Sequence, residues 1–308
     1  MAFESVSIQQ TPPTDHFITL NGLRLHYVDW GGDAARDTLL LLHGGAANTH
    51  WWDYVAPHLT ELGRVLALDF RGHGRSQWTS LEHYGPRGYV EDTEALIDQL
   101  GTRVILGGHS MGAMVAVWVA TRRPEWLKML LVLDSPGTPP SLWRRLQWNW
   151  RRRAQGGTRP EMASRDEVLR RFHLVPGPST VSREILTDLA LKSSEQLPNG
   201  RWAFRFDPQT RAWRRVGAGR LPYPKVRSIH LPTLILRGAQ STILSPRRAR
   251  LLHRRIAGSV LQEIPNAYHH ITLDNPPATT AAIVDFVRAR QAAEETGGQI
   301  QASQVRVR

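Results

Sequence analysis

The chain has 308 residues, 41% of them hydrophobic, which is enough for a large domain with its own core. It carries a formal net charge of +12 and no cysteine, which excludes disulfides, a thiol nucleophile and thiolate metal ligands. No nucleic-acid motif accompanies the charge, and no apolar run approaches the roughly 18 residues that span a bilayer. The first residues lack the basic start and apolar stretch of a signal peptide. We therefore expect a cytoplasmic protein that binds no nucleic acid and does not insert stably into membranes.

The predicted elements alternate between strands and helices. Residues 16–20 and 23–30 alternate polar and apolar side chains around Asn21-Gly22, which predicts a hairpin. Short apolar runs predict buried strands at residues 38–42, 65–70, 104–107, 129–133, 233–236 and 260–264. Helical patterns separate most of these runs, at residues 51–62, 89–100, 111–123, 246–256 and 278–290. This order predicts an α/β fold with a mostly parallel sheet of about eight strands and helices on both faces.

The alternation stops between residues 139 and 229, where the chain is polar and rich in Trp and Arg. We expect a cap of helices and loops there, inserted into a core formed by residues 16–138 and 230–290. Residues 1–15 are expected to be a flexible lead and residues 291–308 a disordered tail. The cap holds an apolar stripe, Leu142, Leu146 and Trp150, flanked by arginines that indicate a solvated helix face. Its aromatic residues fit either a substrate pocket or the packing of the cap itself: Trp143, Trp148, Trp150, Trp202, Phe204 and Trp213.

The most informative motif is Gly108-His109-Ser110-Met111-Gly112, a G-x-S-x-G sequence between a predicted strand and a predicted helix. This context indicates a nucleophile elbow, a sharp turn that exposes the serine hydroxyl. The glycines relieve the crowding of the backbone at such a turn. The backbone N–H of Met111 then lies at a helix N-terminus, where it can stabilise developing negative charge.

A serine nucleophile needs donors for the oxyanion that it creates and a base that takes its proton. The segment Leu41-Leu42-His43-Gly44-Gly45-Ala46 ends a predicted strand and is rich in glycine. We expect the Gly45 N–H to be the second oxyanion donor beside that of Met111. The base is expected to be a histidine. His43 is expected to brace the oxyanion loop, and His109 is expected to point away from the serine.

These features together resemble the α/β-hydrolase superfamily. The resemblance rests on His43-Gly44-Gly45, on the segment from Asp69 to Ser76, on the elbow at Ser110 and on a late histidine before an Asp-x-Pro segment, and it covers roughly residues 18 to 290. In that superfamily the catalytic histidine lies five residues before the Asp. Asp274-Asn275-Pro276 therefore indicates His269 rather than His270 as the base. Asp69 and His73 resemble the scaffold of the superfamily, not its chemistry.

The acid departs from the superfamily's usual pattern. Relatives commonly carry an Asp after the strand that here covers residues 234–236, but this chain has Thr242 there and no carboxylate nearby. Asp134, which ends the preceding strand of the sheet, is the expected acid, because a triad is defined by roles and not by position in the chain. Asp274, the cap residue Asp207 or no acid at all remain alternatives. Asp274 is expected to cap the helix that begins near Pro276.

The resemblance implies a serine hydrolase that cleaves an ester-like bond of a small apolar or aromatic substrate without metal or organic cofactor. In the proposed mechanism Ser110 attacks, His269 takes the proton, Asp134 orients His269, and Gly45 and Met111 hold the oxyanion. A cofactor-free perhydrolase and a C–C bond hydrolase are alternatives on the same fold. A ligand-binding protein without turnover is another, favoured by the missing acid at Thr242. Halide and epoxide chemistry would require a carboxylate at the elbow, and Ser110 argues against both.

Overall fold

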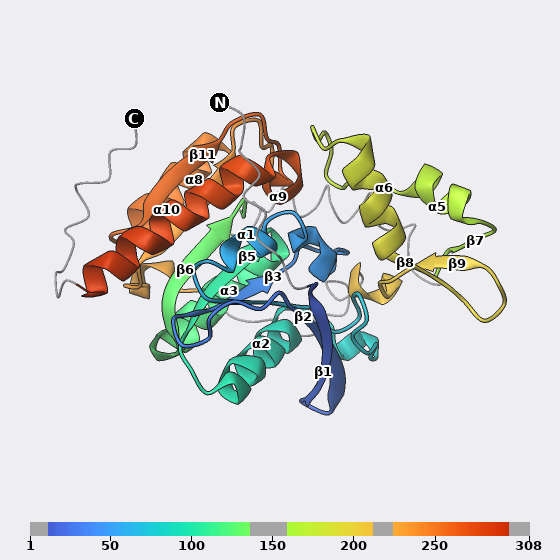
Figure 1. The fold of residues 1–308 in the computed structure, drawn as a ribbon, viewed down its shortest axis with the longest axis horizontal. Coiled ribbons are helices and arrows are strands. Elements are labelled where there is room, and N and C mark those ends of the chain that lie inside the picture. The colour runs from blue at the N-terminus through green and yellow to red at the C-terminus, as the bar shows by residue number, and fades with distance from the viewer. Residues whose placement is uncertain (1–11, 136–158, 212–223, 296–308) are drawn as a thin grey trace.

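A computed structural model of the chain describes residues 12–135, 159–211 and 224–295. Its main sheet has eight strands in the order β1-β2-β4-β3-β5-β6-β10-β11 (Figure 1). The pairs β1–β2 and β2–β4 are antiparallel, and the other five pairs are parallel. The mostly parallel sheet expected from the sequence is confirmed. The strands are β1 Thr14–Leu20, β2 Leu23–Asp29, β3 Thr38–Leu42, β4 Arg64–Leu68, β5 Val104–His109, β6 Leu127–Leu133, β10 Thr233–Gly238 and β11 Val260–Ile264.

The opening hairpin forms at the predicted turn. Asn21 has φ 50° and Gly22 has φ 75°. Positive φ at both central residues is the geometry that matches the twist of a two-residue hairpin, and Asn-Gly adopts it readily. Strand β1 already begins at Thr14, inside the stretch that was expected to be a flexible lead.

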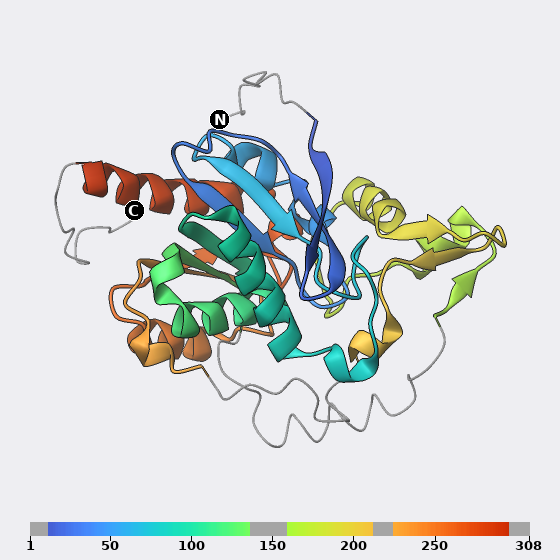
Figure 2. The ribbon, with the colours of Figure 1, turned by 90° about the horizontal axis from the view of Figure 1, so that it is seen from below.

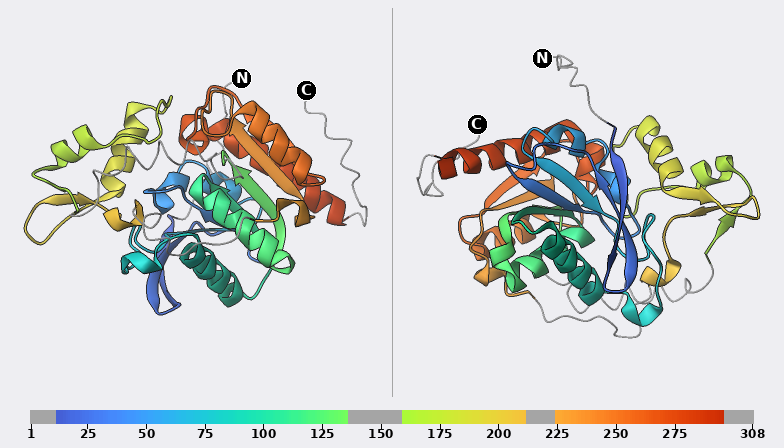
Figure 3. Two further views of the ribbon diagram at one scale, coloured as in Figure 1. Left: turned by 180° about the vertical axis from the view of Figure 1, so that it is seen from behind. Right: turned by 60° about the horizontal axis from the view of Figure 1, so that its bottom comes forward.

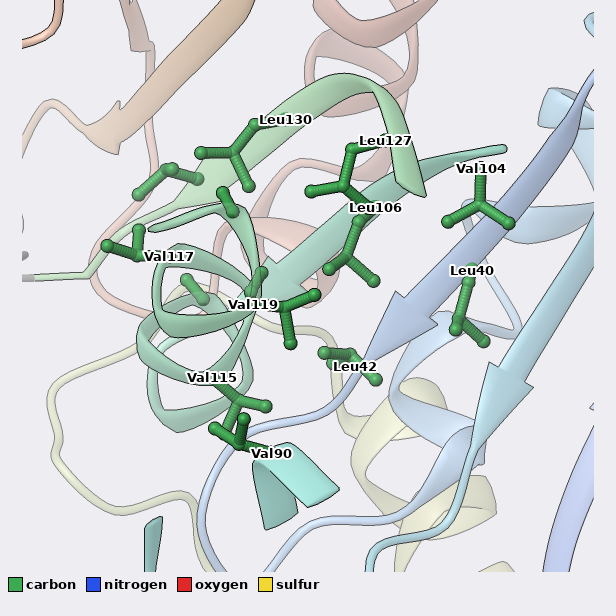
Figure 4. Packing of buried hydrophobic residues seen from close by; sticks show 14 of the residues in the cluster. Leu40, Leu42, Val90, Val104, Leu106, Val115, Val117, Val119, Leu127 and Leu130 are labelled. Carbon is green, nitrogen blue, oxygen red and sulfur yellow. The ribbon is translucent and has the colours of Figure 1, made fainter. Parts of the chain in front are cut away.

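Two layers of helices bury the two faces of the sheet. Helices α2 (Pro86–Leu100), α3 (Met111–Arg122) and α8 (Pro246–Arg255) cover one face, while α1 (Ala56–Leu59) and α10 (Pro276–Glu295) cover the other (Figure 2). Strand β3 divides its leucines between the layers, because successive side chains of a strand point to opposite faces. Leu40 and Leu42 pack on the α3 side, as Figure 4 shows, and Leu39 and Leu41 pack on the α10 side.

Two helices differ clearly from those expected from the sequence. The helix predicted at residues 51–62 is instead a 3-10 turn, η1 (Thr49–Trp52), followed by the single turn α1. Pro57 explains the break, because proline has no N–H to donate to the carbonyl four residues earlier and is tolerated only in the first turn of a helix, where α1 has it. Helix α10 continues to Glu295, five residues into the stretch expected to be disordered. None of the described helices is long and apolar enough to cross a membrane. The remaining short helices are η2 Leu81–His83, η3 Pro124–Trp126, η4 Pro208–Arg211, η5 Val226–Ser228 and α9 Ile271–Asp274.

The cap segment, residues 159–211, lies between β6 and β10 in the chain. Figure 3 shows it beside the sheet from two directions, outside both helical layers. It contains α5 (Arg165–Arg171) and α6 (Arg183–Lys192), and also a three-stranded antiparallel sheet that was not expected. The strands of this sheet are β7 Glu161–Met162, β8 Ser194–Gln196 and β9 Trp202–Phe204. The predicted apolar stripe at Leu142, Leu146 and Trp150, and Trp143, Trp148 and Trp213, lie outside the described residues.

The cap segment joins the core through backbone hydrogen bonds. The Gly74 N–H donates to the Arg205 carbonyl at 2.8 Å, and the Asp207 N–H donates to the Gly72 carbonyl at 2.8 Å. The Asn48 side chain adds a bond to Ser193 Oγ at the end of α6, at 3.0 Å. The segment is therefore attached both to the loop after β4 and to the loop after β3.

Candidate active site

Ser110 lies in a sharp turn between β5 and α3, as the motif predicts. Its backbone has φ 54° and ψ −109°, which a residue with a side chain rarely adopts. Its N–H donates to the Leu133 carbonyl at the end of β6, at 2.9 Å. The turn is therefore held in place by the neighbouring strand.

The two glycines of the motif allow this turn. A Cβ on Gly108 would lie 2.4 Å from the Gly112 carbonyl carbon, so the first turn of α3 passes directly over the end of β5. A Cβ on Gly112 would lie 2.2 Å from the Leu42 carbonyl oxygen in β3. Only glycine permits both approaches, since real Cβ atoms essentially never come closer than 3.0 Å.

Three predicted residues from three separate segments form a line of contacts that begins at the Ser110 hydroxyl. Ser110 Oγ lies 2.9 Å from Nε2 of His269, which follows β11. Nδ1 of His269 lies 2.9 Å from Oδ1 of Asp134, which follows β6. With a proton on Nδ1 donated to Asp134, Nε2 is free to accept the Ser110 proton.

Asp134 is completely buried, with 0% of its surface exposed. Its Oδ2 accepts the Gly238 N–H at 2.7 Å, and its Oδ1 accepts the Ser241 hydroxyl at 2.7 Å in addition to His269. Three donors therefore compensate for the burial of this carboxylate.

The other carboxylates considered for the acid lie in different networks. Thr242, at the usual acid position, is exposed. Asp207 accepts the Tyr84 hydroxyl at 2.7 Å and the Gln209 N–H at 2.8 Å. Asp274 accepts the Tyr268 N–H at 2.9 Å. Of the carboxylates weighed from the sequence, Asp134 is the one that contacts the His269 ring.

The prediction that Asp274 caps the next helix is wrong. The residue that does so is Asn275, whose side-chain oxygen accepts the Ala278 N–H at 3.2 Å, because Asn275 directly precedes the first residue of α10. Asp274 instead connects the cap segment to the histidine loop. One of its oxygens accepts the Thr180 N–H at 2.8 Å and the Ser179 hydroxyl, and the other accepts the N–H of Tyr268.

The expected oxyanion donors lie on either side of Ser110. A Cβ on Gly44 would lie 3.6 Å from Ser110 Cβ, and a Cβ on Gly45 would lie 3.8 Å from Met111 Sδ. The loop that carries Gly45 therefore packs against the elbow. Neither the Gly45 nor the Met111 N–H has an acceptor within residues 12–135, 159–211 and 224–295.

Burial keeps the two neighbouring histidines neutral, and one of them, His109, braces the site. Burial lowers the pKa of His109 well below its usual range, and the charges of His269 and His270 add to the effect. Nε2 of His109 lies 2.8 Å from the His269 carbonyl and holds that loop against the elbow. Burial, followed by the charge of His269, lowers the pKa of His270 to about 3. His270 is therefore uncharged at neutral pH.

His43 braces the oxyanion loop, as expected. Its Nε2 accepts the Phe70 N–H at 3.1 Å, which leaves Nδ1 to carry the proton and donate to the Gly44 carbonyl at 2.7 Å. Asp69 supports the same region by accepting the Thr49 N–H at 2.7 Å and the Arg75 N–H at 2.9 Å. Neither side chain contacts Ser110 or His269, which agrees with a scaffold.

Sequence reasoning missed the two donors that Asp134 receives from the loop after β10. The N–H of Gly238 leaves no trace in the sequence. The hydroxyl of Ser241 had one signal, its place beside a position where relatives carry an acid. Among the described residues no group of three or more His, Asp or Glu side chains is arranged to hold a metal ion.

The chain is similar in sequence and fold to known hydrolases. A family model described as the alpha/beta hydrolase family matches residues 39–283. The chain is 27% identical over 267 residues to the esterase Rv0045c of Mycobacterium tuberculosis, covering 84% of this chain and 83% of that protein. It is 27% identical over 287 residues to epoxide hydrolase 3 of Xenopus tropicalis, covering 87% and 76%. An alpha/beta hydrolase structure from Novosphingobium aromaticivorans matches with a TM-score of 0.74 and 27% identity, covering 90% of this chain and 98% of that one.

Proposed function

The chain belongs to the alpha/beta hydrolase family, and from this we propose that it is a serine hydrolase that cleaves a carboxylic ester or a lactone. The proposal rests on one observation, the continuous line of contacts from Ser110 Oγ through His269 to Asp134, each 2.9 Å long. A serine with a base at hydrogen-bond distance, and a base oriented by a carboxylate, is the arrangement that activates a hydroxyl for acyl transfer.

The reaction proceeds in two halves. Ser110 Oγ attacks the carbonyl carbon while His269 Nε2 takes its proton, and the Gly45 and Met111 N–H groups stabilise the oxyanion. His269 then protonates the leaving alcohol, which leaves an acyl-serine. A water molecule attacks the acyl carbon while His269 takes a proton from the water. His269 then returns this proton to Ser110 Oγ as the carboxylic acid product departs. Asp134 stabilises the imidazolium in both halves.

A small apolar or aromatic substrate fits the surroundings of the oxyanion loop. Ala47 and Trp51 follow Gly45 in the chain and pack in an apolar cluster with side chains from the cap segment. The cap members include Leu189 and, partly buried, Phe172 and Leu174. Apolar groups from both parts of the molecule therefore meet close to the proposed donors.

Ser110 favours one of the activities named for the relatives. One relative is named an esterase and another an epoxide hydrolase. Because epoxide chemistry on this fold requires a carboxylate at the elbow, the serine favours the ester reaction. The activity screen for esters and lactones should also test the alternative reactions directly. It should include an epoxide, a diketone for C–C bond hydrolysis, and an assay of peracid formation with hydrogen peroxide.

Labelling with a fluorophosphonate probe tests the proposal. The wild-type protein should gain the mass of one probe less HF on Ser110, because fluoride leaves as the serine oxygen bonds to phosphorus, and Ser110→Ala should neither label nor hydrolyse any ester in the screen. Ser80→Ala is the matched control, because Ser80 is exposed and its hydroxyl bonds to Glu82, far from the proposed triad in the part of the chain that the structure describes. Hydrolysis by purified Ser110→Ala, or a wild type that binds esters without labelling or turnover, would count against the proposal.

A further inference from the structure

The loop that follows β10 folds over the Asp134 carboxylate. Strands β6 and β10 run parallel with Leu133 opposite Leu236, so both end at the same edge of the sheet. The Asp134 N–H continues this pairing by donating to the Leu236 carbonyl at 2.8 Å. The loop therefore lies next to Asp134, and its residues 239–246 include no carboxylate.

The hydrogen bonds of Ser241 determine where its proton points. Ser241 Oγ accepts the N–H groups of Ile243 and Leu244, both at 3.2 Å. A hydroxyl has two acceptor positions and one proton. With both acceptor positions used by backbone donors, the proton is directed to Oδ1 of Asp134, 2.7 Å away. This is the same oxygen that receives the His269 ring.

The loop is attached to the histidine segment as well as to the acid. The Ala239 N–H donates to the Ile264 carbonyl at 2.9 Å, and the Gln240 N–H donates to the Ala267 carbonyl at 3.0 Å. A Cβ on Gly238 would lie 1.8 Å from the Tyr268 carbonyl oxygen, so the backbones touch one residue before His269. Ser241 is therefore held at a fixed place relative to both Asp134 and His269.

We infer that Ser241 is a positioning residue for a relocated acid, an inference that rests on the triad proposed above. The loop that usually supplies the acid supplies instead a hydroxyl that orients Asp134. Together with the Gly238 N–H, this hydroxyl holds Oδ1 toward His269 Nδ1 and spreads the carboxylate charge over three donors. Without this hydroxyl, the carboxylate rotates more freely, and with one donor fewer its negative charge stabilises the protonated imidazole of His269 more strongly.

Substitution of Ser241 by Cys tests this role while keeping the same side-chain connectivity, since a thiol is a larger group but a weak donor and the chain has no other cysteine. We expect kcat for an activated ester to fall about tenfold with KM unchanged, as expected when one hydrogen bond to a charged group is weakened. The acid limb of the kcat/KM profile should move upward by about half a pH unit, because His269 becomes easier to protonate. Ser241→Ala should show both effects more strongly. Ser241→Thr, which retains the hydroxyl, should restore the position of the acid limb.

Thr242→Ala is the control, because it removes an exposed hydroxyl from the neighbouring residue. A folded Ser241→Cys whose kcat and acid limb match those of wild type would overturn the inference while leaving the proposed function intact. In another outcome, kcat falls in Ser241→Cys and Ser241→Ala but the acid limb stays in place in both, and Ser241→Thr does not recover kcat. That result would assign Ser241 a merely structural role and would also overturn the inference. Failure of the wild type to label at Ser110 would instead remove the proposed function itself.

Discussion

Replacement of Asp134 by Asn is the most direct test of the relocated acid. The carboxylate accepts three donors, from His269, Ser241 and Gly238, and it is completely buried. An amide has only one oxygen, so its NH₂ group must face at least one of these donors. The substitution keeps the shape of the side chain and changes only its charge and its hydrogen bonding.

Both orientations of the amide impair His269. With its oxygen toward His269, the NH₂ group faces the Gly238 N–H, and a neutral amide no longer stabilises the imidazolium. With its NH₂ toward His269, it donates to Nδ1 and moves the ring proton to Nε2, so that Ser110 faces a donor instead of a base. Neutralising the acid of a related triad lowers kcat by about 10⁴-fold, equivalent to about 5.5 kcal/mol of barrier. One buried donor without a partner also lowers the free energy of unfolding by about 1–3 kcal/mol.

The assay is steady-state hydrolysis of an activated ester by Asp134→Asn, with Thr242→Ala beside it and urea unfolding of both. We expect the first to lose about four decades of kcat and the second to remain within twofold of wild type. The double variant Ser110→Ala with Asp134→Asn should be no worse than Ser110→Ala, because residues that act as a unit are not additive. The reasoning fails if Asp134→Asn retains a tenth of the activity while Thr242→Ala loses orders of magnitude.

Three further predictions concern the stability of the scaffold. Ser110→Gly should abolish turnover and raise the free energy of unfolding by about 1 kcal/mol in urea titrations, because glycine relieves the strained backbone; a loss of stability would argue against strain. Gly112→Ala should destabilise by more than about 2 kcal/mol, whereas Gly177→Ala, whose new methyl would meet nothing nearer than 3.9 Å, should unfold like wild type. Burial, followed by the charge of His43, lowers the pKa of His73 to about 3 in the folded protein. Between about pH 3 and the usual histidine pKa of about 6.5, the His73 side chain therefore binds a proton only in the unfolded chain. The contribution is complete above about pH 6.5 and decreases by about 1.4 kcal/mol per pH unit as the pH falls; His73→Gln should flatten this slope between pH 6 and 4, and an unchanged slope would assign it to other groups.

Much of the core was predictable because its strands are short, continuous apolar runs. The structure has β3 and β11 at the predicted bounds, and the other core strands differ by one or two residues at one or both ends. The cap sheet was not predictable, because β8 and β9 have three residues each and β7 has two, too few to show a period. Pro57 did carry a signal that was overlooked, since proline within a helical pattern marks a break.

The site was predictable as far as motifs and chain order reach. Spacing before Asp274-Asn275-Pro276 singled out His269 from its neighbour His270, and the expected contact with Ser110 is present. The empty position at Thr242 pointed to Asp134, but nothing in the sequence measures whether a side chain after β6 reaches the same imidazole. That depends on the three-dimensional course of the loop after β10.

Asp274 also bears on the engineering of this protein. Its carboxylate joins Ser179 and Thr180 of the cap segment to the backbone beside His269. A chimera that exchanges the cap for that of a relative would remove both donors from one oxygen of this carboxylate and leave it with the Tyr268 N–H alone, next to the histidine loop. Grafts that begin after Thr180, or that transfer a Ser-Thr pair with the new cap, keep both donors to the Asp274 carboxylate. The useful boundary for recombination is therefore set by this carboxylate and not by the ends of the inserted segment.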